Sequence, residues 1–163
     1  MTQHTQTHAT FVLERRYPVP VDRVWAAFAD PEIKRTWFGG GEFVDVSRSD
    51  DFRVGGTWTD DGRPGEDGPM SRFRATYTDI VENARIVYSY DMWLDDAHAS
   101  TSLSTVALEA VDTAEGPATR LTYTEQGVHL DGVHGPGPEA AAGREEGTAG
   151  LLDALGATLT AGR

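Results

Sequence analysis

The 163-residue sequence contains no cysteine, which excludes disulfide bonds, cysteine-ligated zinc sites and thiol nucleophiles. It also has no run of about 18 apolar residues, the length that a membrane-spanning helix needs. The first ten residues lack the basic and apolar regions of a signal peptide. We therefore expect a soluble protein located in the cytoplasm.

Positive charge is scarce as well. The chain has 14 Lys and Arg residues against 26 Asp and Glu residues, a formal net charge of −12, and Lys34 is its one lysine. Such a protein repels phosphate backbones and anionic lipid surfaces on average. We expect no nucleic-acid partner and no membrane partner.

Motifs for nucleophiles, nucleotides and metals are missing too. There is no Gly-x-Ser-x-Gly motif, and the three glycines at 39–41 are not followed by the Lys and Ser/Thr of a phosphate-binding loop. His129, Asp131 and His134 have a spacing that fits no established zinc signature. We expect no cofactor and no bound metal.

The strongest pattern that is present is a long helix from Pro138 to about Leu159. Pro138 suits a first helical position, and one apolar stripe has helical spacing: Thr148, Leu151, Leu152, Leu155 and Leu159. Four glycines weaken this helix: Gly143, Gly147, Gly150 and Gly156. They either let a sheet approach closely or leave space beside the leucines, and the sequence does not decide between an ordinary packed helix and a cavity.

Alternating residues predict seven strands ahead of that helix. The first strand spans residues 10–17, two short helices follow around Val24 and after Asp30, and six further strands cover about 42–48, 53–60, 70–81, 85–93, 101–111 and 118–126. Short connections imply antiparallel pairing, and the acidic stretch 60–69 is expected to be a solvated loop. The fold class is α+β: a curved seven-stranded antiparallel sheet around a long C-terminal helix. Residues 1–9 are expected to be a disordered tail and residues 10–163 a single domain.

Glu125 is the main candidate for chemistry. It comes one alternation beyond Leu121 and Tyr123, on the face of the sheet that should turn toward the helix. A desolvated carboxyl group there could act as an acid or base, or it could lie at the rim, paired with an arginine or water. His129, on the glycine-rich loop that follows, is a second acid/base candidate.

Several segments also resemble one known family. They are residues 14–25 (ERRYPVPVDRVW), 30–32, 37–38, 53–58 (RVGGTW), 119–127 (TRLTYTEQG) and 151–155 (LLDAL). With the order of elements, they are similar to the START-like or SRPBCC superfamily, in the branch named after the activator of heat-shock protein 90 ATPase. This resemblance implies a helix-grip fold whose space between sheet and helix holds a hydrophobic small molecule. Members act as polyketide cyclases, carriers or receptors, and one is a cochaperone.

Residues and resemblance together lead to three functional hypotheses. The first is a binding protein for an apolar or aromatic ligand, contacted by Trp37, Phe73, Tyr77, Tyr88, Tyr90, Tyr123, Leu151 and Leu155. The second is a polyketide cyclase or dehydratase-like enzyme using Glu125 or His129 as acid or base. The third is a chaperone-related protein-interaction module. Ligand identity, catalysis and a homodimer are left open.

Overall fold

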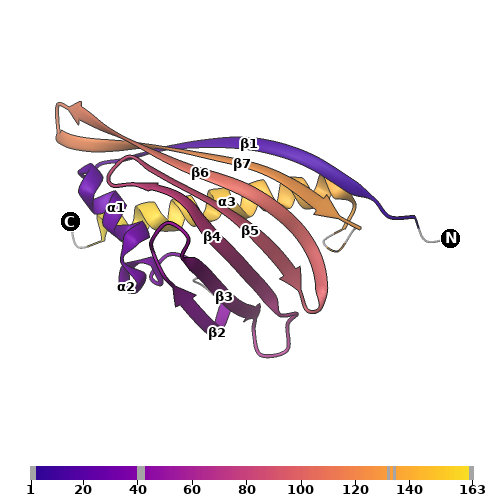
Figure 1. Ribbon diagram of the computed structural model, residues 1–163. Helices are drawn as coiled ribbons and strands as arrows, with labels where there is room; N and C mark the ends of the chain where they lie inside the picture. The colour runs from indigo at the N-terminus through magenta and orange to yellow at the C-terminus, as the bar shows by residue number, and fades with distance from the viewer. Residues whose placement is uncertain (1–2, 40–42, 132, 134, 162–163) are drawn as a thin grey trace.

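The computed structural model describes residues 3–39, 43–131, 133 and 135–161. Within these residues, seven antiparallel strands form one sheet in the order β1-β7-β6-β5-β4-β3-β2, and three helices accompany it (Figure 1). The strands are β1 (Gln6–Tyr17), β2 (Phe43–Asp50), β3 (Thr57–Pro64), β4 (Ser71–Val81), β5 (Arg85–Leu94), β6 (Ala97–Thr113) and β7 (Gly116–Leu130). The helices are α1 (Val21–Ala29), α2 (Pro31–Lys34) and α3 (Gly137–Thr160).

This arrangement confirms the predicted fold class. The sheet curves around α3, which lies along its concave face, and the two short helices close one end of the molecule (Figure 1). All six strand pairs are antiparallel. The architecture is the helix-grip fold that the resemblance implied.

The first strand begins earlier than predicted. β1 starts at Gln6, which pairs with Leu130 near the end of β7, so residues 6–9 belong to the sheet. The predicted tail of residues 1–9 is therefore too long. The physical reason is that β7 continues to Leu130 and offers its backbone groups to the polar residues before Thr10.

A side-chain cap starts the second short helix, and a tryptophan ties its end to the first. Asp30 accepts a hydrogen bond from the backbone N–H of Glu32 at 2.9 Å, and Pro31 occupies the first position of α2. The indole N–H of Trp37 donates to the carbonyl oxygen of Ala27 at 2.9 Å and ties the end of this segment to α1. Together these bonds hold the aromatic ring of Trp37 against the core.

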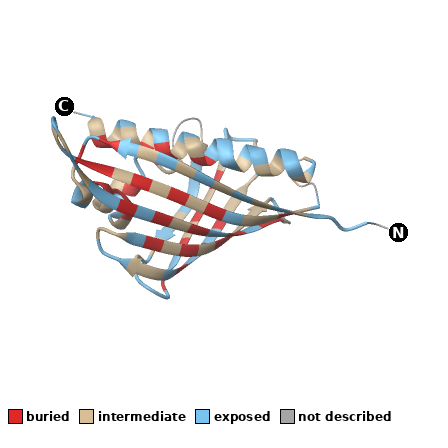
Figure 2. Cartoon of the chain, turned by 90° about the horizontal axis from the view of Figure 1, so that it is seen from above, coloured by how far each residue is buried: buried red, intermediate tan, exposed pale blue. Residues whose placement is uncertain are grey.

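Side chains alternate in burial along the strands, as Figure 2 shows by colour. On β4 the buried members are Phe73, Ala75 and Tyr77, and on β5 they include Tyr88 and Tyr90. The core therefore lies between the concave face of the sheet and the helices. Among the described residues, no helix combines the length and the apolar character needed to cross a membrane.

The glycines of α3 have both of the predicted effects, close approach to the sheet and free space beside the helix, at different parts of the helix. At Gly156 an added Cβ would lie 3.1 Å from a ring carbon of Tyr17, so the helix packs closely on β1 there. The Tyr17 hydroxyl also donates to the carbonyl oxygen of Leu152 at 2.8 Å. At Gly143 and Gly147 an added Cβ would meet no atom within 4 Å. The helix is flush with the sheet near its C-terminus and leaves space near its N-terminus.

Candidate functional site

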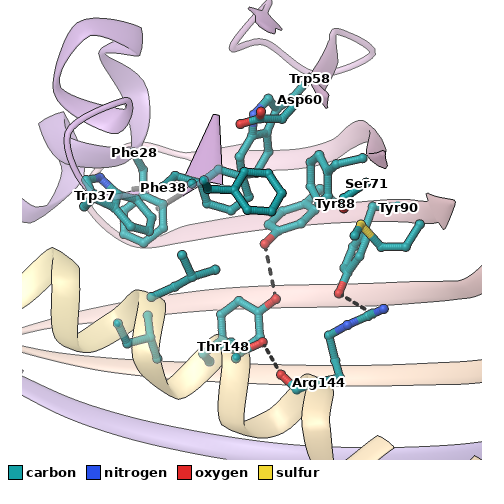
Figure 3. A pocket seen from close by; sticks show the side chains of 18 of the residues that line it. Phe28, Trp37, Phe38, Trp58, Asp60, Ser71, Tyr88, Tyr90, Arg144 and Thr148 are labelled. Atoms are coloured by element: carbon teal, nitrogen blue, oxygen red, sulfur yellow. Dashed lines mark hydrogen bonds between the residues drawn. The ribbon is translucent and has the colours of Figure 1, made fainter. Parts of the chain in front are cut away.

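A cavity of about 460 Å³ lies between the concave face of the sheet and α3. Its walls are largely aromatic and apolar (Figure 3). It is lined by Phe28, Trp37, Phe38, Gly39, Phe43, Trp58, Asp60, Ser71, Phe73, Tyr88, Tyr90, Met92, Tyr123, Gly143, Arg144, Gly147, Thr148, Leu151 and Leu152. Contributions from α1, the segment after α2, five strands of the sheet and α3 all meet there.

The N-terminal half of α3 leaves this space open because two of the residues that border it are glycines. Gly143 and Gly147 both line the cavity and have no side chain to fill it. Thr148 covers the next turn, and its hydroxyl donates to the carbonyl oxygen of Arg144 at 2.9 Å. Leucines follow only from Leu151 onward, where the helix closes on the core.

One end of the cavity is polar and centres on Arg144 of α3. Its Nη1 donates to the Tyr90 hydroxyl at 2.8 Å and to Glu125 Oε1 at 3.2 Å, and its Nη2 donates to Ser100 Oγ at 2.8 Å. The side chain of Arg144 is 14% exposed and that of Glu125 is 2% exposed. Arg144 and Glu125 thus form a buried ion pair at the cavity wall.

Tyrosine hydroxyl groups surround the carboxylate. Tyr90 donates to Glu125 Oε1 at 2.7 Å, and Tyr123 donates to Oε2 at 3.0 Å. The Tyr123 oxygen is also 2.8 Å from Ser104 Oγ and 3.2 Å from the Tyr88 hydroxyl. The tyrosines line the cavity and Glu125 does not, so the carboxylate lies behind them.

Burial controls the charge of these groups. It raises the pKa of the Tyr88, Tyr90 and Tyr123 hydroxyls well above the ordinary value, so all three are protonated at neutral pH. Burial works against the charge of Arg144, yet Tyr90 and Glu125 outweigh it and raise the pKa of the guanidinium. A ligand at this end would meet neutral hydroxyls and one neutralised ion pair.

Asp60 supplies a second polar group in the lining. Its carboxylate lies 2.8 Å from Arg48 Nη2, which also donates to the carbonyl oxygen of Phe38 at 2.7 Å. Burial raises the pKa of Asp60 to about 6. The sequence placed Asp60 in a solvated loop, and this prediction is wrong: β3 continues to Pro64 and buries the side chain to 6% exposure.

Six of the eight predicted ligand contacts line the cavity: Trp37, Phe73, Tyr88, Tyr90, Tyr123 and Leu151. Tyr77 and Leu155 do not belong to the lining. Tyr77 is held in a separate cluster, where it accepts from Lys34 Nζ at 2.9 Å and donates to Asp50 at 2.8 Å. Leu155 is fully buried in the packed part of the core.

The two acid/base candidates are both buried. Glu125 faces inward and is 1% exposed, so it is not at a solvated rim, although it does pair with an arginine. His129 is 5% exposed and is not part of the cavity lining. His134 lies outside the described residues. Within the described part of the chain, no cluster of three His, Asp or Glu residues is placed to hold a metal ion.

Sequence reasoning did not single out Arg144, although a signal was present. Arg144 comes four residues before Thr148 and continues the stripe that Leu152, Leu155 and Leu159 extend. A charged residue at a core-facing position of a helix indicates a buried partner. Glu125 was the acidic residue predicted on the facing side of the sheet.

Comparisons with known proteins agree with this fold. A family model described as Activator of Hsp90 ATPase homolog 1-like protein matches residues 18–160. No curated protein matches the chain. A solved structure of an uncharacterised protein from Rhizobium leguminosarum has 40% sequence identity and a TM-score of 0.85, covering 97% of this chain and 98% of that one.

Two further solved structures are similar. Mll3558 from Rhizobium loti has 45% identity and a TM-score of 0.81, with 94% of this chain and 99% of that chain covered. DynU16, a protein of the dynemicin biosynthetic locus, has 21% identity and a TM-score of 0.65, with 94% of this chain and 48% of that chain covered, and shares the fold alone. Because the family model spans most of its length, the chain belongs to the Activator of Hsp90 ATPase homolog 1-like family, within the START-like helix-grip superfamily.

Proposed function

We propose that this protein binds a small apolar or aromatic molecule in the cavity between the sheet and α3. The observation that carries the proposal is the cavity itself: about 460 Å³, with aromatic walls and a polar end built from Arg144 and three tyrosines. Pockets of about 300–1,000 Å³ with apolar walls and a few convergent polar groups are typical of small-molecule sites. The family fits such a role, because the helix-grip fold leaves this space between sheet and helix.

The geometry favours a flat ligand. Phe38, Trp58 and Phe73 form one continuous aromatic wall, with ring centroids 4.5 to 5.6 Å apart. Aromatic faces and edges of this kind stack on a ring system without needing a charged group. Burying the ligand's apolar surface would provide most of the binding free energy, and the polar end would set its orientation.

The first test is native mass spectrometry of gently purified protein, followed by thermal-shift screening with aromatic polyketides, flavonoids and fatty acids. We expect a bound small molecule, or a melting temperature that rises with ligand concentration. Gly147→Leu should abolish the response, because it adds a bulky side chain at a residue that lines the cavity and has open space beside it.

The matched control is Gly150→Leu. Gly150 lies in the same helix and, like Gly147, is exposed with open space around it, but it does not line the cavity. This variant should keep the wild-type response. A wild-type protein that carries nothing and responds to no compound contradicts the proposal, as does an unchanged response in Gly147→Leu.

A second candidate function is a cyclase or dehydratase for polyketide-like substrates, favoured by one observation. Tyr90 and Tyr123 line the cavity, and the hydroxyl of each is hydrogen-bonded to Glu125, which lies behind them. A proton from a substrate could pass through such a hydroxyl to the carboxylate. Incubating any stabilising ligand with the protein tests this: conversion should be slower with Tyr90→Phe, and recovery of unchanged ligand rejects catalysis on it.

The chaperone-related hypothesis stays a prediction. An interaction surface of this kind would need a contiguous exposed apolar patch. The exposed large apolar side chains of the described residues are spread over β1, β2, β4, β6 and the loop after β2: Val12, Val44, Val46, Val54, Val81 and Leu103. Their distribution gives this hypothesis no support.

A further inference from the structure

The hydrogen bonds at the polar end of the cavity have a definite direction. A carboxylate carries no proton, so it accepts every hydrogen bond it makes. Glu125 is ion-paired with Arg144, and the hydroxyls of Tyr90 and Tyr123 contact its two oxygens at 2.7 and 3.0 Å. Both tyrosines therefore donate their protons to Glu125, away from the cavity.

This direction fixes the neighbouring bonds as well. The Tyr123 hydroxyl has one proton and Glu125 receives it. The contacts of Tyr123 with Ser104 at 2.8 Å and with Tyr88 at 3.2 Å can then form only if Ser104 and Tyr88 are the donors. The proton of Tyr88 is consequently donated to Tyr123 and is not free for a ligand. The protons of all three tyrosine hydroxyls are therefore already used. Toward any further partner, such as a ligand, these oxygens can only accept hydrogen bonds.

The hydrogen-bond donors and acceptors that the tyrosines and Arg144 leave unused are the ones that a ligand would meet. The Tyr123 oxygen already accepts from Ser104 and Tyr88, and the Tyr90 oxygen accepts from Arg144. In the hydrogen bonds of this cluster the Tyr88 oxygen accepts from none of the described residues, so it is the tyrosine oxygen with the most free lone pairs at the Arg144 end. The other acceptor of note in the lining is the Asp60 carboxylate, which pairs with Arg48. Arg144 uses three of its five N–H groups in bonds to Tyr90, Glu125 and Ser100. Its other N–H groups remain as donors beside the Tyr90 ring, whose centroid lies 5.5 Å from the guanidinium carbon.

We propose that the ligand is an aromatic molecule with a free hydroxyl group, phenolic or enolic, that donates its proton to Tyr88 and accepts from Arg144. This inference rests on the proposed binding function and specifies its ligand class. An ether or a ketone could accept from Arg144 but would face the Tyr88 lone pairs without a proton. A site that hydrogen-bonds a ligand O–H discriminates strongly against analogues that lack it, because its polar groups are then left unpaired.

The experiment compares matched pairs of compounds by isothermal titration calorimetry at pH 7. One pair is 2-naphthol and 2-methoxynaphthalene, and the other is 2-hydroxyanthracene and 2-methoxyanthracene. We expect the hydroxyl compound of each pair to bind about 10-fold or more tightly. Equal affinity, or preference for the ether, overturns the inference and leaves the binding function standing. Binding of neither pair also overturns the inference, while the proposed function is judged separately by the native mass spectrum and the wider screen.

Variants separate recognition from a merely structural role. Tyr88→Phe removes the acceptor, and the preference for the hydroxyl compound should fall to about 3-fold or less, since one neutral hydrogen bond is lost. Tyr17→Phe is the matched control: Tyr17 is also buried and hydrogen-bonded, but it does not line the cavity, so the preference should be unchanged. A preference that survives in Tyr88→Phe overturns the inference.

Glu125→Gln tests the direction of the network. The amide NH₂ would donate to one tyrosine hydroxyl, which would then turn its own proton toward another acceptor, including a ligand. The preference should therefore shift toward the ether relative to wild type. An equal loss of affinity for both compounds would mark Glu125 as structural only and overturn the proposed direction. If this variant does not fold, the Tyr88→Phe and Tyr17→Phe pair still decides.

Discussion

Two regions of this protein bury an ion pair next to tyrosine hydroxyls, and only one of them borders the cavity. The Lys34 cluster joins a lysine of α2 to the end of β2 and to β4, and consists of Lys34, Asp50 and Tyr77. The Arg144 cluster joins α3 to β5 and β7, and consists of Arg144, Glu125, Tyr90 and Tyr123. Both have a helix cation, a strand carboxylate and a hydroxyl that links them.

The clusters differ in access. Lys34 is 2% exposed, and its Nζ lies 4.0 Å from the centroid of the Trp58 ring, which separates it from the cavity side. No member of the Lys34 cluster lines the cavity, whereas Arg144, Tyr90 and Tyr123 all do. A buried ion pair therefore marks a candidate site only when its hydrogen-bonding groups reach an open space.

Stability alone does not account for the Lys34 cluster. Burial lowers the pKa of Lys34 to about 8, even though Asp50 works in the opposite direction. Desolvation of such a pair commonly matches or exceeds its Coulombic attraction. We infer that the cluster mainly fixes where α2 sits against β2 and β4, and so positions Trp37 and Phe38 at the cavity wall.

The largest expected effect is at Lys34. Lys34→Ala would leave Asp50 as an uncompensated buried charge, and we expect the free energy of unfolding to fall by about 3–5 kcal/mol in urea titrations. The double variant Lys34→Met with Asp50→Leu is the control, because it removes both charges and should recover most of that loss. A loss below about 1 kcal/mol in Lys34→Ala would show that water reaches this cluster, and the distinction between sealed and open clusters would fail.

Asp60 provides a third case, because it belongs to a buried ion pair with Arg48 and also lines the cavity. Its pKa is raised from 3.8 to about 6, so the folded state holds this proton more tightly than the unfolded state. Its contribution to stability is therefore full below about pH 4 and is lost as the pH rises through 6. Relative to Asp60→Asn, the wild-type free energy of unfolding should fall by up to about 3 kcal/mol between pH 4 and pH 7. A difference that stays constant with pH would contradict the shift.

Arg144→Ala tests directly whether the two clusters differ in their access to open space. It also leaves a buried carboxylate, Glu125, but the cavity beside it can admit water, and two tyrosines still donate to the carboxylate. We expect a loss of about 1–3 kcal/mol in urea titrations, smaller than for Lys34→Ala. An equal loss in the two variants would mean that the Arg144 cluster is as sealed as the Lys34 cluster.

Most of the fold could be predicted because it depends on local signals. Alternating residues, short polar turns, Asp30 before Pro31, and the stripe from Thr148 to Leu159 each indicate one element without reference to the others. Strand ends were less accurate, since the extent of β1, β6 and β7 depends on the strand that each one pairs with.

The polar groups of the site were harder to predict because their burial depends on distant partners. Arg144 and Glu125 are 19 residues apart, and Lys34 and Asp50 are 16 apart. An acidic stretch such as 60–69 looks solvated in the sequence, and only the pairing of β3 with β4 shows that Asp60 belongs to the sheet. The aromatic wall was easier, because its members alternate on neighbouring strands.

The smallest expected effect tests the open space beside the Arg144 cluster. Gly143 precedes Arg144, lines the cavity and has no atom within 4 Å of an added Cβ, and Gly150 has the same free space but lies outside the lining. Both Gly143→Ala and Gly150→Ala should raise the free energy of unfolding by up to about 1 kcal/mol, because alanine favours the helix. Only Gly143→Ala should also weaken binding of a cavity ligand, since its methyl group occupies part of the space. If Gly143→Ala destabilises the protein while Gly150→Ala stabilises it, the helix must approach the sheet at Arg144, and the two buried clusters would not differ in access.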